Sequence, residues 1–157
     1  MNKFLFFVVV TLLTVACKTN KVDSPEGAIG KKLVLSHGGG FTGKYNSYTL
    51  LENGQLFKAS ETKGVLNQQK DLADDVVDQI FSNYEVLGLA EMEVETYGNL
   101  LYTIQMIDGD NTNKISWEKG DKGSETLQLF FRNVMNQIKL NNDPNYNPNK
   151  SKIKAKF

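Results

Sequence analysis

Three stretches between residues 32 and 61 have the pattern of strands. Leu33 and Leu35 lie on one face of residues 32–36, residues 45–51 carry aromatic and β-branched side chains, and residues 55–61 form the next stretch. A period of two is typical of a strand with one buried face. Asn53-Gly54 separates the second and third stretches, and this pair is typical of a tight hairpin turn. The pattern therefore predicts three strands, with the last two forming a hairpin.

Two later segments carry apolar residues at helical spacing. From Asp71 to Tyr84, apolar residues recur every four positions, and Ser124 is a suitable N-cap for a second helix that ends near Leu140. The apolar face of the first is formed by Leu72, Val76, Val77, Ile80, Phe81 and Tyr84, and that of the second by Leu127, Phe130, Phe131, Val134 and Ile138. Each face is wide enough to cover a sheet.

The strand pattern returns between the two helices. Residues 91–95 alternate as a short edge strand would, residues 100–107 form a strong strand, and residues 114–118 form another. The predicted order is βββαββα. This order predicts an α+β fold: an antiparallel sheet of about five strands with two amphipathic helices on one face. We expect a single domain over residues 31–140.

The N-terminus has the form of an export signal. Residues 1–16 carry Lys3 and then an unbroken apolar run from Phe4 to Val10, which is too short for a comfortable membrane span. Thr14-Val15-Ala16-Cys17 resembles the lipobox of bacterial lipoproteins, which implies lipidation at Cys17 and a membrane-anchored, periplasm-facing protein of the cell envelope. The alternative is an ordinary exported protein with a free cysteine. Residues 17–30 are polar and predict a lipidated tether.

Composition narrows the possible functions. Cys17 is the single cysteine, so no intramolecular disulfide is possible and the core must hold the fold. The chain has 18 basic and 18 acidic residues, so it lacks the positive charge typical of nucleic-acid binding. Residues 141–157 are rich in Asn, Pro and Lys and predict a flexible basic tail.

The most distinctive stretch is a glycine-rich loop after the first strand. We take it as the candidate partner-binding loop, because function often lies on loops held by a rigid scaffold. Phe41 in its middle has two readings, a plug that packs under the end of the sheet or an anchor offered to a partner; we favour the plug, with the glycine backbone facing the partner. The loop comprises His37, Gly38, Gly39, Gly40, Phe41, Thr42 and Gly43.

Part of this loop imitates a phosphate-binding motif. Gly38 to Lys44 has a glycine, four residues and then Gly-Lys, but Tyr45 stands where that motif needs Ser or Thr. The residues that follow predict a strand, whereas the motif needs a helix N-terminus facing the phosphates. We therefore expect no nucleotide binding.

Three acidic or histidine features favour structural roles. Asp108, Asp110 and Thr112 have calcium-like spacing, but the loop lacks the required later glycine and acid, which favours a plain hairpin. Asp71, Asp74 and Asp75 suit the positive end of the first helix. His37 is the single histidine and stands apart from any nucleophile and acid set. We expect no catalytic residues, no metal, no cofactor and no enzyme activity.

The order of motifs resembles the emfourin family of small metalloprotease inhibitors. Gly39, Gly40, Phe41 and Gly43 match a Gly-Gly-Phe-x-Gly segment, and the similarity covers most of residues 32–139. The resemblance implies a protease partner. We expect a lipid-anchored, non-enzymatic binding module that acts through its glycine-rich loop, with protease inhibition as one form of that activity. The alternatives are a structural subunit of an envelope complex and an enzyme of unknown type.

Overall fold

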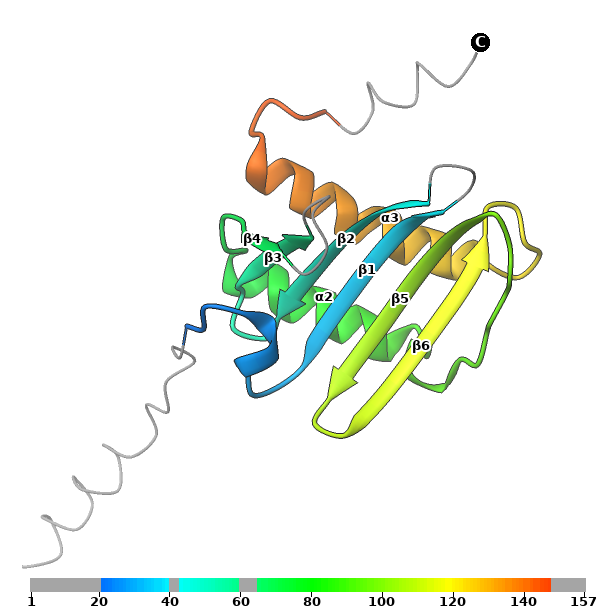
Figure 1. The fold of residues 1–157 in the computed structure, drawn as a ribbon, viewed down its shortest axis with the longest axis horizontal. Helices are drawn as coiled ribbons and strands as arrows, with labels where there is room; N and C mark the ends of the chain where they lie inside the picture. Colours follow the sequence, from blue (N-terminus) through cyan, green and yellow to red (C-terminus); the bar gives the residue numbers. More distant parts are fainter. Residues whose placement is uncertain (1–20, 40–42, 60–64, 148–157) are drawn as a thin grey trace, which may run out of the picture.

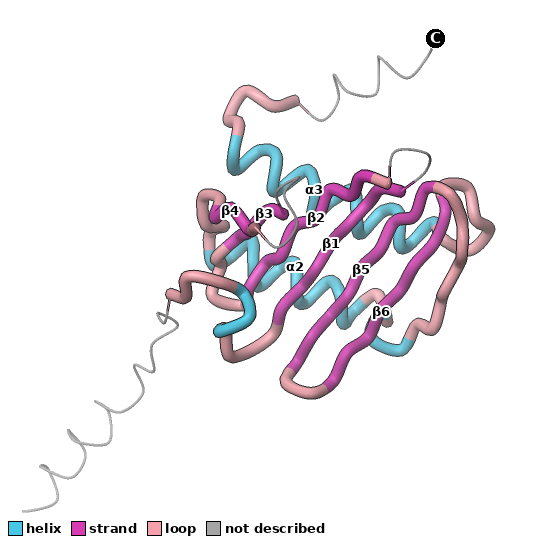
Figure 2. The backbone as a smooth tube through the Cα atoms, in the orientation of Figure 1, coloured by secondary structure: helices cyan, strands magenta, loops and turns pink. Residues whose placement is uncertain are grey.

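The computed structural model describes residues 21–39, 43–59 and 65–147. Its centre is an antiparallel sheet of six strands in the order β4-β3-β2-β1-β5-β6 (Figure 1). The strands are β1 (Lys32–Gly39), β2 (Lys44–Leu51), β3 (Leu56–Ala59), β4 (Leu66–Gln68), β5 (Leu100–Asp108) and β6 (Asn111–Glu118). Two helices, α2 (Asp74–Val86) and α3 (Glu125–Asn142), lie against one face (Figure 2). The predicted α+β class is confirmed.

The number and limits of the elements differ from the prediction. The sheet has six strands, because the polar stretch Leu66–Gln68 pairs with β3 as an edge strand. Residues 91–95 do not form a strand of the sheet. The 3-10 helix η4 (Leu89–Glu91) ends there, and Glu95 makes only an isolated bridge with Ser116. An edge strand needs few apolar side chains, so the sequence pattern gave little signal for β4.

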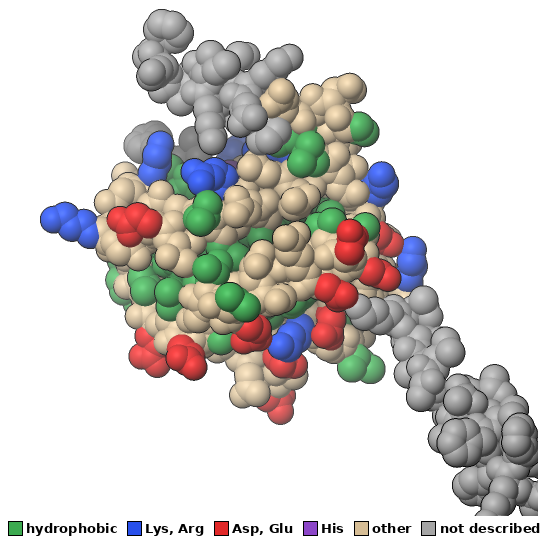
Figure 3. Space-filling model, turned by 180° about the vertical axis from the view of Figure 1, so that it is seen from behind, with side chains coloured by type: hydrophobic (Ala, Val, Ile, Leu, Met, Phe, Trp, Pro, Cys, Tyr) green, Lys and Arg blue, Asp and Glu red, His purple; other side chains and the backbone are tan. Residues whose placement is uncertain are grey.

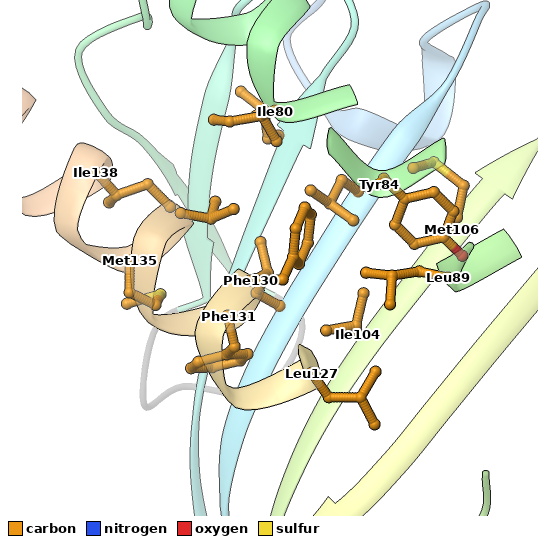
Figure 4. Close-up of a cluster of buried hydrophobic side chains, with 14 of the residues drawn as sticks. Ile80, Tyr84, Leu89, Ile104, Met106, Leu127, Phe130, Phe131, Met135 and Ile138 are labelled. Atoms are coloured by element: carbon orange, nitrogen blue, oxygen red, sulfur yellow. The ribbon is translucent and has the colours of Figure 1, made fainter. Parts of the chain in front are cut away.

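The core lies between the sheet and the two helices (Figure 4). The alternation predicted from Leu33 and Leu35 holds, and both are fully buried. From α3, the buried side chains are those of the predicted apolar face together with Met135. From α2, Val77, Ile80 and Tyr84 are buried, whereas Phe81 and Val76 are partly buried and pack against the core.

The predicted hairpin turns are confirmed. Gly54 has a φ of +89°, and Leu51 N–H donates to the Gln55 carbonyl across the Asn53-Gly54 turn. Asp108 pairs with Asn111, so the acidic stretch after β5 contains a plain two-residue hairpin turn at Gly109-Asp110, and β6 begins at Asn111 rather than at the predicted residue 114. A strand follows Lys44, and the helix required for a phosphate-binding loop is therefore not there.

Residues 21–30, part of the segment predicted as a tether, contact the domain. Val22 N–H donates to Gln55 Oε1 at 2.8 Å, Gln55 Nε2 donates back to the Val22 carbonyl at 2.9 Å, and Lys21 forms an ion pair with Asp71 at 2.9 Å. The short helix η2 (Pro25–Gly27) follows, with Pro25 buried. Within the described residues, no helix has the length and apolar character needed to cross a membrane.

Candidate functional site

The candidate loop leaves the sheet at the end where β1 turns into β2. In this row of the sheet, Gly38 pairs with Tyr45 on one side and Leu101 on the other. A Cβ atom on Gly38 would lie 2.2 Å from the Lys44 carbonyl oxygen, and one on Gly39 would lie 2.8 Å from the Asn99 carbonyl oxygen. These two glycines are therefore required by close backbone approach, whatever the loop binds.

Gly43 differs from Gly38 and Gly39. It has a φ of +59°, and the space around a Cβ atom there is open. Its glycine serves the left-handed backbone of the turn rather than a tight contact. Gly40, Phe41 and Thr42 lie outside the described residues, as does Cys17, so both readings of Phe41 and the lipidation of Cys17 stay predictions.

His37 belongs to a row of aromatic side chains that crosses three strands. In the register of the sheet it pairs with Tyr102 on β5, which pairs with Trp117 on β6. The His37 and Tyr102 rings are stacked with centroids 6.0 Å apart, and those of Tyr102 and Trp117 with centroids 5.8 Å apart. Phe131 on α3 meets all three rings edge-on, at centroid distances of 5.4–6.0 Å. These geometries are the favourable ones for aromatic pairs.

This aromatic row forms the floor of a cavity of about 350 Å³, which we call the aromatic cavity. Three cationic side chains also line this cavity: Lys119, which follows β6, and Arg132 and Lys139 of α3. Tyr146, beyond α3, closes one side: its hydroxyl donates to Asn136 Oδ1 at 3.0 Å, and Lys139 Nζ lies 5.5 Å from its ring centroid. The residues that line the cavity in the described part of the chain include three cations and no carboxylate.

Two buried nitrogen atoms of the floor have no hydrogen-bond partner among the described residues. In the part of the chain that the structure describes, this is true of His37 Nδ1 and Trp117 Nε1 alone among buried side-chain nitrogen and oxygen atoms. Burial lowers the pKa of His37 below its ordinary value, and the positive charge of Lys139 lowers it further. His37 is therefore neutral at pH 7.

The opposite end of the same sheet face is built differently. Tyr84 of α2 is buried, and its hydroxyl donates to Asn113 Oδ1 at 2.8 Å. Asn113 Nδ2 donates to the Ala90 and Met92 carbonyls at 3.3 and 3.1 Å. Burial, with a smaller contribution from Glu85, raises the pKa of Tyr84 to about 12. Among the described residues, a cavity of about 270 Å³ beside Tyr84 is lined by one cation, Lys31, and by the carboxylates of Glu85 and Asp108.

Sequence reasoning placed His37 in the candidate site but missed its neighbours Tyr102, Trp117 and Phe131. A signal for the first two was present, because each lies two residues from a buried core residue, Ile104 or Ile115, and so faces the same side of its strand. What the sequence did not state was the register between β1, β5 and β6. The basic residues of α3 were unremarkable until the helix was placed beside this row.

The three aspartates that the sequence places near the start of the first helix lie in or just before the first turn of α2. Asp74 and Asp75 lie in the first turn of α2, and Asp71 precedes it and binds Lys21. Over residues 21–39, 43–59 and 65–147, there is no cluster of three or more His, Cys, Asp or Glu residues that could hold a metal ion. A comparison with models of protein families and a comparison with curated proteins each found no match to this chain.

Proposed function

We propose that this protein is a lipid-anchored, non-enzymatic binding module of the bacterial cell envelope, and that it binds a protein partner through the β1–β2 end of its sheet. The observation that carries this proposal is a set of exposed apolar side chains around the glycine-rich turn. Tyr45 is 55% exposed and Leu100 is 44% exposed. Gly39 pairs with Leu100 and lies beside the Tyr45 hydroxyl, so both side chains flank the turn.

The type of side chain supports protein binding at this end. Tyrosine offers a large, rigid contact surface with one polar atom and is enriched where proteins bind each other. Tyr97, which is 84% exposed, precedes β5, but its neighbours Glu95 and Thr96 lie beside Ser116 of β6. We call Tyr45 and Leu100 the tyrosine surface.

Lipidation of Cys17 would supply the proposed membrane anchor. Stable anchoring needs more than one acyl chain, which a lipidated N-terminal cysteine provides. Changing Cys17→Ser should release the protein from the membrane fraction. A variant that stays in that fraction, with an N-terminal peptide of unchanged mass, would contradict lipidation.

Partner binding is tested with the protein solubilised in detergent and used to recover bound proteins from its own membranes. Tyr45→Ala and Leu100→Ala should each reduce recovery of the same partner by about 10-fold or more if they are central contacts, because truncated anchors typically cost 2 kcal/mol or more. Leu129→Ala is the matched control, because Leu129 is also 44% exposed but lies on α3. Equal recovery by all variants would exclude the tyrosine surface.

The emfourin resemblance makes an extracytoplasmic metalloprotease the partner class to test first. A panel of zinc proteases should include at least one whose activity falls in the presence of the wild-type protein and recovers with Phe41→Ala or Tyr45→Ala. The same Phe41→Ala protein should be melted in parallel. Lost stability would indicate the plug reading of Phe41, whereas unchanged stability with lost inhibition would indicate the anchor reading.

A structural subunit of an envelope complex is the second candidate function. The observation that favours it is the sheet face turned away from the helices, which no helix covers in the described part of the chain (Figure 1, Figure 2). Its centre is small and polar: Ser36 pairs with Ser47 and Thr103, and the Thr103 and Ser116 hydroxyls lie 3.3 Å apart. Ser36→Arg would place a bulky side chain there. Loss of partner recovery in this variant, with Tyr45→Ala unaffected, would favour the second function.

A further inference from the structure

The aromatic cavity has features that partner binding at the tyrosine surface does not use. Its floor consists of ring faces and edges held rigidly by the sheet register and by Phe131. Trp117 is fully buried and Phe131 is 7% exposed, so neither side chain can be rearranged without disturbing the core. A rigid aromatic floor favours a ligand with a planar or otherwise apolar body, because burying that body needs no ordering of the protein.

The charges beside the floor all have one sign. Lys119, Arg132 and Lys139 line the cavity, and within the described residues neither Lys119 nor Arg132 forms an ion pair. Lys139 Nζ lies 5.5 Å from the Tyr146 ring centroid, and it forms no ion pair with another described residue. Figure 3, which shows the helix side of the molecule, has acidic side chains along its lower edge and on its right side, and another at the left. Cations gathered in a cavity that has no carboxylate among its described lining residues favour an anionic ligand.

The polar atoms of the floor add a second, independent observation. A buried donor or acceptor without a partner costs about 1–3 kcal/mol, so folds rarely leave two together. His37 Nδ1 and Trp117 Nε1 both belong to rings that line this cavity. The Tyr84 end of the sheet, where the polar atoms are paired and the charges are mixed, shows that the same fold can satisfy such groups.

The size of the cavity limits the ligand. About 350 Å³ lies at the small end of the range for ligand sites. It suits one small organic molecule rather than a nucleotide or a folded segment. Gln128 and Asn136 also line the cavity, and their amides provide further donors near the cations.

We propose that the aromatic cavity binds a small organic carboxylate with a planar apolar body. The body lies against the His37, Tyr102 and Phe131 rings, with the buried Trp117 ring packed against Tyr102 and Phe131, and the carboxylate lies beside Arg132 and Lys139. This site is separate from the tyrosine surface. Its binding does not depend on Cys17 or on a protein partner, and each proposal can fail while the other holds.

The chain offers a site-specific reporter for the test. Trp117 is the only tryptophan, so the full-length ¹⁵N-labelled protein in a neutral detergent gives one indole N–H resonance. Four probes are titrated: 1-naphthylacetate, its neutral amide 1-naphthylacetamide, acetate and inorganic phosphate. We expect 1-naphthylacetate to shift the Trp117 resonance saturably with a Kd on the order of 1 mM or tighter, as its size suggests. The amide should bind at least about fivefold more weakly, and acetate and phosphate should cause no saturable shift.

Charge variants show whether the proposed cations hold the carboxylate. Arg132→Gln and Lys139→Gln should each weaken 1-naphthylacetate binding by about two- to fivefold and leave 1-naphthylacetamide unchanged, as expected for partly exposed ion pairs. Lys114→Gln is the matched control, because Lys114 is an exposed cation on β6 whose side chain faces the other side of the sheet from Asn113 and Ile115. Unchanged resonances elsewhere in each variant show that the fold is kept.

Several results would overturn the proposal. Equal affinities for the amide and the carboxylate would show that the cavity binds only the apolar body and that its cations do not hold the carboxylate. A saturable shift with acetate or phosphate alone, equal to that with 1-naphthylacetate, would reduce it to a simple anion site. The absence of any saturable shift up to the solubility of 1-naphthylacetate, or an equal loss of affinity in Lys114→Gln, would exclude the site.

Discussion

The helix-covered face of the sheet has two ends, each built around a large buried aromatic residue. The two ends differ in whether the polar atom of that residue has a hydrogen-bond partner. At the α2 end, the Tyr84 hydroxyl binds Asn113, which in turn binds two backbone carbonyls. At the α3 end, Trp117 Nε1 and His37 Nδ1 lack partners within the described residues. The first end has the completeness expected of scaffold, whereas incomplete satisfaction beside a cationic cavity is typical of a binding site.

The largest expected effect concerns the side chain that joins the aromatic row to the core. Phe131→Ala should reduce the free energy of unfolding by about 3–5 kcal/mol, because Phe131 is almost fully buried and meets three rings. Phe81→Ala on α2 should cost about 1–2 kcal/mol, because Phe81 is only partly buried. Urea denaturation measures both. Equal losses would show that the α3 end is no more tightly packed than the half-buried face of α2.

The tight backbone at the cavity end gives the next effect. Gly38→Ala should destabilise the domain by about 1–3 kcal/mol or more, because the new methyl group would meet the Lys44 carbonyl. Gly27→Ala is the control, since no atom lies within 4 Å of a Cβ there and its backbone is not in the left-handed region. A comparison of melting temperatures suffices. A tolerated Gly38→Ala would leave the binding loop as the remaining reason for glycine at this position.

A matched pair of ring substitutions compares the two ends directly. Tyr84→Phe should cost about 1–2 kcal/mol, because it leaves the buried acceptor of Asn113 without its donor. His37→Phe removes an atom that has no partner among the described residues, so its cost should be within about 0.5 kcal/mol. Chemical denaturation at pH 7 distinguishes the two. A cost for His37→Phe as large as that for Tyr84→Phe would mean that His37 is scaffold as well.

The smallest effect is a dependence of stability on pH. The pKa of His37 is lowered in the folded domain, so as the pH falls below about 6.5 the unfolded chain takes up a proton first. The contribution of neutral His37 to the free energy of unfolding is thus complete above pH 6.5. It is lost as the pH falls toward the folded-state pKa. The charged or titratable groups that line the cavity with His37 are Tyr102, Lys119, Arg132, Lys139 and Tyr146. Only the difference between wild type and His37→Phe isolates this contribution.

The same histidine can be followed directly. His37 is the only histidine in the chain, so its ring resonances report its pKa without assignment of others. Lys139→Gln should raise this pKa toward its ordinary value, because it removes a positive charge that disfavours the imidazolium ion. An unchanged pKa in Lys139→Gln would place Lys139 too far from His37 to act with it in one site.

The sequence by itself determined the fold class and most of the elements. Period-two alternation around Leu33 and period-3.6 spacing in α2 and α3 are local properties, because they follow from the geometry of single strands and helices. Turn chemistry is equally local: it placed the Asn53-Gly54 hairpin, and it placed a second hairpin between residues 107 and 114, although β6 begins at Asn111. Local signals were weaker at the limits, since α2 begins at Asp74 rather than Asp71. Ser124 is the N-cap residue of α3 as predicted, but its hydroxyl donates to the Asp121 carbonyl.

Only the tertiary structure decided what lies beside what. His37, Tyr102 and Trp117 are far apart in the sequence, and each is an ordinary strand residue there; the register of β1, β5 and β6 stacks them in one row. Arg132 and Lys139 are surface residues of a helix until α3 is laid across that row. A cavity and its charge arise from several elements together, and no single stretch of sequence contains them. Strand register and helix placement depend on packing over the whole core, which is why this site was not predicted.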